Sequence, residues 1–327
     1  KPVRDGMWSG NIKKYGVAQA NNPSLGISIG DLLDATGSKA LDSTGQILNT
    51  ARSFWTASDT LDGPDVEQGG LGELLMNRSS SRKIYTHMGV NATLTDDSNA
   101  FSLSNPLVTP ETLGLGVGDT AARDKLINFV HGLDAYDDNA NGDTAEKRDW
   151  VMGAFLHSRP LILHYGTDQS VIFAGSNGGM LHAFDDATGQ ELWSFVPRNL
   201  LQRLSALHQD VLEAFVDGSP KAYVGTTDNK KIIIFGQRRG GDRYVALDVS
   251  DRLTPKFLWE INPSMDGFSE LAQTWSSPQI AKVRLGSEAK WVAFIAAGFD
   301  DNQDNDPVTL PDSKGRAIYM VDVFTGA

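Results

Sequence analysis

The sequence predicts an all-β protein, an irregular β-propeller that is incomplete in this chain, with long loop insertions and a few short helices. Short runs of β-branched and aromatic residues recur between turn residues, and Val171–Trp193 alone contains three of them. The chain has 33 glycines among 327 residues, which suits many tight turns. The pattern Asp-x-x-Thr-Gly occurs at Asp185–Gly189 and again at Asp322–Gly326. Together these observations favour repeated antiparallel sheets.

The predicted strands follow one another in sets of up to four, as in propeller blades. The first set is Pro160–Tyr165, Val171–Gly175, Met180–Asp185 and Leu192–Val196, with a two-residue hairpin turn at Asn177–Gly178. The second set is Lys221–Gly225, Ile232–Phe235, Tyr244–Asp248 and Phe257–Glu260, and the pattern returns in Trp291–Gly298 and Ile318–Gly326. The repeat spacing exceeds about 60 residues, against roughly 40–50 for regular propeller repeats, so we expect long insertions and about four blade-like units.

Two tryptophans occupy matching places in this repeat. Trp193 follows Asp185 on the next strand, and Trp259 follows Asp248 in the same way. A large side chain at this position can close the gap between two twisted sheets. We therefore expect each Trp to dock on a neighbouring blade.

A helix is predicted at Thr120–Leu133, because Leu126, Phe129, Val130 and Leu133 have the spacing of one helical face. Thr120 is the expected cap. Shorter helices are expected at Gly72–Met76 and Asn199–His208. The predicted organisation is residues 1–119 as N-terminal strands and loops that form the first blade or blades, 120–149 as the helix and an acidic loop, and 150–327 as propeller blades.

The composition restricts the function. The net charge of −12 disfavours nucleic-acid binding and favours cations. No apolar run is long enough to predict a membrane span. The absence of cysteine excludes disulfides, thiolate metal sites and a cysteine nucleophile. Because Lys1 is the first residue and a blade-type turn comes directly before Ala327, we expect the chain to be part of a longer polypeptide.

Two acidic loops are candidate calcium sites, because calcium prefers six to eight hard oxygen ligands and both loops place such groups at alternate positions. The first resembles the start of an EF-hand loop, although Arg148 stands where that loop has its bidentate Glu. The second lies in an insertion after a predicted strand. For each loop the alternative is a solvated acidic turn. The candidate metal ligands are Asp137, Asn139, Asn141 and Asp143 in the first loop and Asp300, Asn302, Asp304 and Asp306 in the second.

The sequence shows no catalytic motif. His157, His164 and His182 are scattered near or on strands, and no Ser/His/Asp pattern accompanies them. Gly69–Gly72 lacks the Lys-Ser/Thr pair of a phosphate-binding loop. We therefore expect a protein that is not an enzyme, with hydrogen-bonded structural histidines.

Several blocks of the sequence resemble the PilY/PilC family of type IV pilus proteins, and they occur in the same order as in that family. The blocks are Met7–Tyr15, Ser79–Gly89, Arg148–Gly166, Ala174–Leu201, Val216–Val224, Gly236–Ser250, Leu271–Val283 and Gly315–Gly326. The resemblance extends over most of the chain, and the succession of blocks is more specific than any one of them.

The resemblance implies the C-terminal propeller domain of a large secreted protein that promotes pilus assembly and extension and opposes retraction. It also implies adhesion to a host or abiotic surface, partnership with minor pilins and other pilus-tip components, and an extracellular location at the pilus tip or outer cell surface after passage through the periplasm. The family's calcium loop, which tunes extension and retraction, falls beyond Ala327 and is not carried over to either acidic loop. The Arg-Gly-Asp motif of some relatives is absent.

Two alternatives remain open. The segment AFDDATGQELW also resembles the tryptophan-docking repeats of quinoprotein dehydrogenases, which bind pyrroloquinoline quinone and calcium at the propeller centre. Such an enzyme needs a preorganised polar site around the quinone, and the vicinal cysteine pair frequent in that group is missing. The other alternative is a propeller that serves as a scaffold in a different surface assembly.

Overall fold

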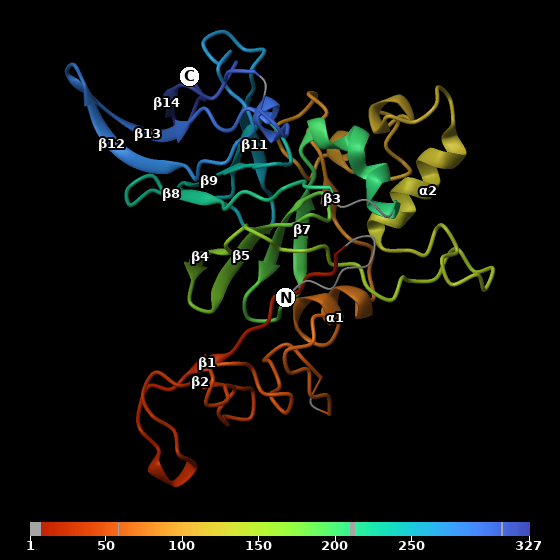
Figure 1. Cartoon of the computed structure of the whole chain (residues 1–327), viewed down its shortest axis with the longest axis vertical. Coiled ribbons are helices and arrows are strands. Elements are labelled where there is room, and N and C mark those ends of the chain that lie inside the picture. Colours follow the sequence, from red (N-terminus) through yellow and green to blue (C-terminus); the bar gives the residue numbers. More distant parts are fainter. Residues whose placement is uncertain (1–7, 58, 210–212, 309) are drawn as a thin grey trace.

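The computed structural model describes residues 8–57, 59–209, 213–308 and 310–327, so the beginning of the predicted N-terminal segment, including Met7, lies outside the described residues. Most of the regular structure is β-strand, arranged as three sheets of three or more strands together with one short two-stranded pair. Figure 1 shows the three sheets stacked one after another along the chain. The all-β prediction is confirmed. The described residues form blade-like sheets without a closed ring.

The first sheet has five strands in the order β3-β7-β6-β5-β4. Its strands are β3 (Ile84–Tyr85), β4 (Leu161–Gly166), β5 (Gln169–Gly175), β6 (Leu181–Asp185) and β7 (Glu191–Phe195). Strands β4 to β7 form the predicted antiparallel meander. The short strand β3 joins it in parallel orientation beside β7, which the sequence did not indicate.

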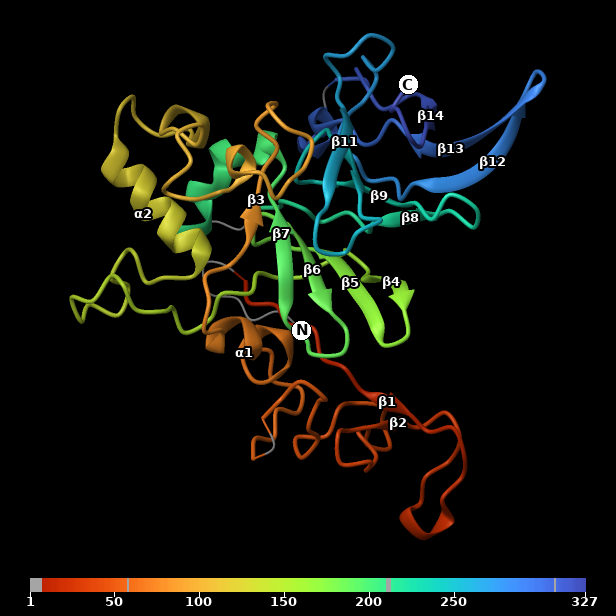
Figure 2. The same cartoon turned by 180° about the vertical axis from the view of Figure 1, so that it is seen from behind.

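The second and third sheets repeat this antiparallel pattern. The second consists of β8 (Lys221–Val224), β9 (Lys231–Gly236), β10 (Tyr244–Asp248) and β11 (Lys256–Ile261), and the third of β12 (Gln279–Leu285), β13 (Glu288–Ala296) and β14 (Ile318–Asp322). The back view in Figure 2 shows the β12–β13 hairpin extending away from the body of the molecule. The third sheet therefore has one strand fewer than a complete four-stranded blade.

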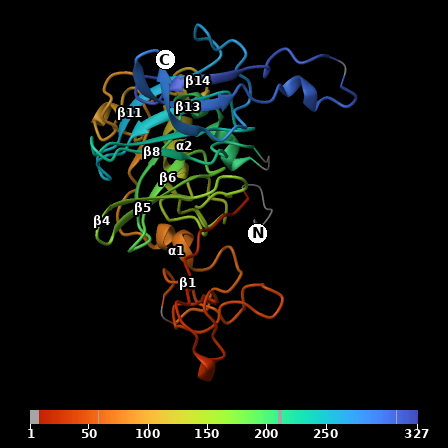
Figure 3. The same ribbon diagram turned by 90° about the vertical axis from the view of Figure 1, so that its left-hand side faces the viewer.

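Short elements make up the N-terminal part. They are β1 (Gly16–Val17), η1 (Pro23–Leu25), β2 (Leu32–Leu33), α1 (Gly70–Asn77), η2 (Asp97–Asn99) and η3 (Glu111–Leu113). In Figure 3 the region around β1 extends beyond the sheets at one end of the molecule. Of the described residues up to 119, those in β3 join the first sheet, Thr93 forms an isolated antiparallel bridge with Lys256 in β11 of the second sheet, and β1 pairs with β2. The predicted division of the chain at residues 119 and 149 stays a prediction.

The remaining helices lie close to their predicted positions. Helix α2 spans Thr120–His131, but its cap is Asp119, whose Oδ1 accepts from the backbone N–H of Ala122 at 2.9 Å. The prediction of Thr120 as the cap was wrong by one residue, because a carboxylate at the preceding position reaches the free N–H group. Residues Arg198–His208 form a 3-10 helix, η4, and Asp301–Asp304 form the last one, η5.

The predicted two-residue turn at Asn177–Gly178 is also wrong. The connection between β5 and β6 is longer, with the N–H of Ser176 donating to the carbonyl of Met180 at 3.0 Å and the positive φ at Gly179 (93°). The reason is a contact distant in sequence. A Cβ on Gly153 would lie 2.3 Å from the backbone N of Gly178, so the turn is shaped by the backbone packed against it.

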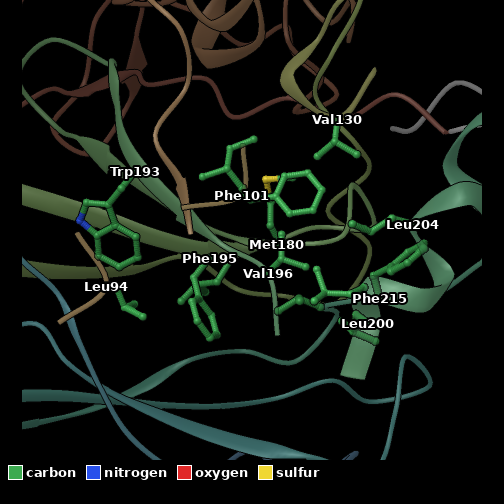
Figure 4. Packing of buried hydrophobic residues seen from close by; sticks show 14 of the residues in the cluster. Leu94, Phe101, Val130, Met180, Trp193, Phe195, Val196, Leu200, Leu204 and Phe215 are labelled. Carbon is green, nitrogen blue, oxygen red and sulfur yellow. The ribbon is translucent and has the colours of Figure 1, made fainter. Parts of the chain in front are cut away.

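The largest hydrophobic core lies between the first and second sheets, α2 and η4. Figure 4 shows Trp193, Phe195 and Phe215 within it, together with Leu94 and Phe101 from the loops that precede α2. Each of these side chains is almost completely buried. Burying a side chain of this size stabilises the fold by about 1.5–3 kcal/mol, so the long insertions are held to the sheets by apolar contacts.

The predicted docking of both tryptophans is confirmed. The indole N–H of Trp193 donates to the carbonyl of Arg252, which follows β10 in the next sheet, at 2.9 Å. The indole N–H of Trp259 donates to the carbonyl of Val323, which follows β14 in the sheet after that, also at 2.9 Å. Each sheet is thus fixed to the next by a buried aromatic side chain whose polar atom is satisfied.

Candidate functional site

The first acidic loop connects α2 to the first sheet, and its first residues, 134–138, are held by contacts with the rest of the protein. Asp134 is buried, and its carboxylate Oδ1 accepts from the N–H of Asp138 at 2.9 Å. His208 on η4 lies 2.9 Å from Asp138 and stacks on Tyr136 at 3.7 Å between ring centroids. A cavity of about 640 Å³ opens beside these groups. Residues 139–145, which follow in the loop, are exposed to solvent.

Three of the four predicted ligands of this loop, Asn139, Asn141 and Asp143, are exposed, and Asp137 is half-buried. Oδ1 of Asp137 accepts from the N–H of Gly142 at 2.9 Å, and Oδ1 of Asn139 and of Asn141 accept from the N–H groups two residues further on. Oδ1 of Asp143 accepts from the N–H of Ala145 at 3.0 Å. One oxygen of every predicted ligand is therefore used by the backbone of the loop itself.

Glu146 is a further acidic group of this loop that the sequence analysis missed. Its Oε1 accepts from the side-chain amides of both Asn139 and Asn141 at 2.6 Å. The acidic residue four places beyond Gly142 was a signal that could have pointed to it. The oxygens of this loop have the hard chemistry that calcium prefers. Among the residues with described positions, no group of three or more His, Asp or Glu is placed to hold a metal ion.

The second acidic loop uses two of its four predicted ligands for other contacts. Asp300 is buried, and its Oδ2 accepts from the hydroxyl of Ser313 at 2.8 Å and from the N–H of Lys314 at 3.0 Å. These hydrogen bonds, the hydroxyl of Ser313 first, lower the pKa of Asp300 to about 2. Asp304 forms an ion pair with Arg239 at 2.9 Å.

The other two predicted ligands of this loop remain at the surface. The side-chain amide of Asn302 donates to the carbonyl of Pro311 at 3.1 Å, and Asp306 is exposed. The loop is therefore a hydrogen-bonded turn whose charges are partly compensated by the protein. The structure does not bring the carboxylates of Asp300, Asp304 and Asp306 together as one ligand set.

A buried polar network lies inside the first sheet, and the sequence analysis did not predict it. The hydroxyl of Ser176 lies 2.8 Å from Nε2 of His182, and Nδ1 of His182 lies 2.8 Å from Oε1 of Glu191. The guanidinium of Arg82 donates to both oxygens of Glu191 at 2.7 Å. Burial alone would raise the pKa of Glu191, but the charge and hydrogen bonds of Arg82 hold it well below its usual value. Burial also lowers the pKa of His182.

The order hydroxyl, imidazole, carboxylate is that of an activated nucleophile. However, Ser176 is 1% exposed and His182 2% exposed, and the hydroxyl of Ser176 also accepts from the N–H of Gly178 at 3.1 Å. A substrate carbonyl cannot reach this oxygen. The network instead connects Arg82, which precedes β3, to β6 and β7, so its role is structural.

Comparison with known proteins gives relatives of one kind. No family model matches the chain. It is 28% identical over 229 residues to the type IV pilus biogenesis factor PilY1 of Pseudomonas aeruginosa strain UCBPP-PA14, covering 60% of this chain and 19% of that protein. It is 25% identical over 309 residues to PilY1 of strain PAK, covering 84% and 24%. A PilY1 homologue of Xylella fastidiosa is 30% identical over 195 residues, covering 57% and 12%.

The solved structures that are similar to the chain match less of it. The C-terminal domain of Pseudomonas aeruginosa PilY1 superposes with a TM-score of 0.36 at 26% identity, covering 49% of this chain and 29% of that one. A quinohemoprotein alcohol dehydrogenase from Pseudomonas putida gives a TM-score of 0.30 at 15% identity, covering 57% and 30%. Both scores are too low to establish a shared fold. The chain spans about a quarter or less of the length of the curated relatives it matches.

Proposed function

The chain belongs to the PilY/PilC family of type IV pilus proteins, and from this premise we propose that it serves as a docking body in the biogenesis of type IV pili. The observation that carries the proposal is the similarity to PilY1, which extends over 309 residues and 84% of the chain. The architecture is compatible with this role, since Trp193 and Trp259 fix the sheets to one another and leave long loops at the surface. The proposed activity is to promote pilus assembly and extension through protein contacts, without covalent chemistry.

The proposed location is the pilus tip or the outer cell surface, reached through the periplasm. The proposed partners are minor pilins and other tip components, and the proposed second activity is attachment to a host or abiotic surface. No helix in the described part of the chain is long and apolar enough to cross a membrane. The chain is acidic overall, with 41 Asp and Glu against 29 Lys and Arg, so we expect partner surfaces with basic groups.

Calcium is proposed as a modulator bound by the first acidic loop. The support is the alternate spacing of Asp137, Asn139 and Asn141, the nearby carboxylate of Glu146 and the net charge of −12. Binding would require the Oδ1 atoms of the loop to exchange their backbone N–H partners for the ion. The second acidic loop is the weaker proposal, because Asp300 and Asp304 already have partners.

The test is genetic. In a host that carries this gene and assembles type IV pili, deletion of the gene should abolish or strongly reduce surface pili, twitching motility and attachment, while the cellular pool of major pilin persists. The intact gene supplied in trans should restore all three. Normal pili and attachment in the deletion strain would refute the proposal. A dye-linked alcohol oxidation by the purified protein, with a quinone absorbance band, would support the quinoprotein alternative instead.

A further inference from the structure

The last three carbonyls of helix α2 each accept a hydrogen bond from a different arginine. The pairs are Phe129 with Arg148 and Val130 with Arg82, both at 3.0 Å, and His131 with Arg78. The C-terminal end of a helix carries only about half a negative charge. Three guanidinium groups therefore bring more positive charge to this place than the end of the helix compensates.

Arg78 has no counter-ion within the described part of the chain. Its guanidinium donates to the carbonyls of Leu75 and His131, and its Nε is buried without a hydrogen-bond partner among the described residues. Arg82, by contrast, is paired with Glu191 at 2.7 Å. Burial first and the charge of Arg82 second lower the pKa of Arg78 to about 10. A half-buried cation of this kind is stabilised by an anion beside it.

Arg78 lines a cavity of about 510 Å³ that has an excess of positive charge. Lys147 also lines it, and its ammonium group donates to the carbonyl of Arg78 but forms no ion pair with a described residue. None of the described residues that line the cavity is Asp or Glu, although the chain has 41 of them. Because Glu191 compensates Arg82, the third cation of the lining, the charges of Arg78 and Lys147 remain uncompensated.

Two kinds of side chain complete the lining. Three consecutive serines have hydroxyl groups without a hydrogen-bond partner in the described structure, namely Ser79, Ser80 and Ser81. Three apolar residues also line the cavity, namely Leu103, Ile127 and Leu133. Cavities of roughly 300–1,000 Å³ with apolar walls and a few polar groups are typical of small-molecule sites. The lining thus provides donors for an anionic group and apolar surface for the body that carries it.

We propose that this cavity binds a small organic phosphate monoester, whose dianionic group pairs with Arg78 and Lys147 and whose apolar body packs on Leu103. A phosphate monoester carries about −1.5 to −2 charges at pH 7, which matches the two uncompensated cations. A carboxylate or a sulfate ester carries a single negative charge and would leave one of the cations unpaired.

The test uses the whole chain and compares phenyl phosphate with inorganic phosphate, phenyl sulfate and benzoate at constant ionic strength. Isothermal titration calorimetry measures the affinities. Phenyl phosphate should bind about tenfold more tightly than each of the others, because inorganic phosphate lacks the apolar body and the other two lack the second charge. On binding, the backbone amide signals of Ser79, Ser80, Ser81 and Lys147 should shift in the NMR spectrum.

Variants of exposed side chains test the two parts of the site separately. Lys147→Gln removes one cation and should weaken the binding of phenyl phosphate about tenfold. Leu103, which is 45% exposed, supplies apolar surface, so Leu103→Ser should weaken phenyl phosphate about threefold and leave inorganic phosphate unchanged. The matched control is Lys83→Gln, an exposed cation outside the lining, which should leave both affinities unchanged.

Several results would overturn the proposal. They are equal affinities for phenyl phosphate and phenyl sulfate, an affinity for inorganic phosphate as high as that for phenyl phosphate, and a loss in Lys83→Gln as large as that in Lys147→Gln. NMR shifts confined to residues outside the cavity would also contradict it. If millimolar phenyl phosphate does not bind, the arginines serve only to cap α2 and the cavity is not a phosphate site.

Discussion

Trp259 in β11 packs directly against Gly326, in the turn that follows β14. A Cβ placed on Gly326 would lie 2.8 Å from Cγ of Trp259, and the φ angle of Gly326 is 76°. The matching Gly189 has the same relation to Trp55, at 2.7 Å and a φ of 74°. Each of the two Asp-x-x-Thr-Gly turns thus ends in a glycine against which an indole ring packs. At Gly189 this ring is that of Trp55, in the N-terminal part of the chain.

The first prediction concerns this contact. Gly326→Ala should lower the free energy of unfolding by about 2–4 kcal/mol, because the methyl group adds overpacking against Trp259 to the cost of a left-handed backbone. The matched control is Gly286→Ala in the β12–β13 turn, where φ is 62° and no atom lies near the new Cβ. The control should cost only about 1–2 kcal/mol. Urea denaturation followed by tryptophan fluorescence measures both, and equal losses would contradict the packing argument.

Local sequence patterns predicted most of the strands, because their signal lies within a few residues. The prediction for Tyr244–Asp248 matches β10 residue for residue. The Asp-x-x-Thr-Gly motif also marked the turns correctly, since Oδ1 of Asp185 accepts from the N–H of Thr188 within the same short segment. The expected count of about four blade-like units was too high for the described residues, which form three sheets of three or more strands.

Contacts between distant residues account for what the sequence did not reveal. The carboxylate of Glu191 and the guanidinium of Arg82 are 109 positions apart and meet only because β3 adds in parallel beside β7. Likewise the first acidic loop was predicted as a ligand set from its spacing, whereas the backbone partners of its Oδ1 atoms depend on turns that spacing alone does not specify.

The second prediction concerns the buried ion pair. Glu191→Gln retains the shape of the side chain but leaves the charge of Arg82 uncompensated, with that side chain only 2% exposed. The free energy of unfolding should fall by about 3–5 kcal/mol. The control is Glu270→Gln, which removes the partner of Arg316, a side chain that is 57% exposed, and should cost less than about 1 kcal/mol. A similar small loss for both variants would show that the network contributes little to stability.

The third prediction is a loss of stability in the pH window that begins at about 6.5, the pKa of an unfolded histidine, and extends below it. Burial lowers the pKa of His182, His131 and His87 in the folded protein. Below the unfolded value of about 6.5 the unfolded chain therefore binds more protons than the folded one, so stability falls as the pH falls. The melting temperature should be highest above this window and should decrease through it.

A variant separates this effect from other titrations. The carbonyl of Phe101 lies 2.7 Å from Nε2 of His131, and a Gln side chain can donate to the same carbonyl. His131→Gln should therefore reduce the difference in melting temperature between pH 7 and pH 5. Burial raises the pKa of Glu260, so the titration of this residue increases stability as the pH falls. Glu260 is present in both the unmodified protein and the His131→Gln variant, so it does not affect their comparison. An unchanged or larger difference in the variant would show that His131 is protonated in the folded state.

The fourth prediction tests calcium. If the first acidic loop binds the ion only in the folded state, calcium at about 100 times its dissociation constant adds roughly 2.7 kcal/mol of stability, and the melting temperature rises. Asp137→Ala combined with Asn139→Ala should abolish this rise, because it removes two oxygen ligands. Asp304→Ala in the second acidic loop is the control and should leave the rise intact. The same variants without calcium show how much of any change comes from lost hydrogen bonds. A calcium-dependent rise that survives in the double variant but disappears in Asp304→Ala would assign the ion to the second loop, and no rise in the unmodified protein would refute calcium binding by this chain.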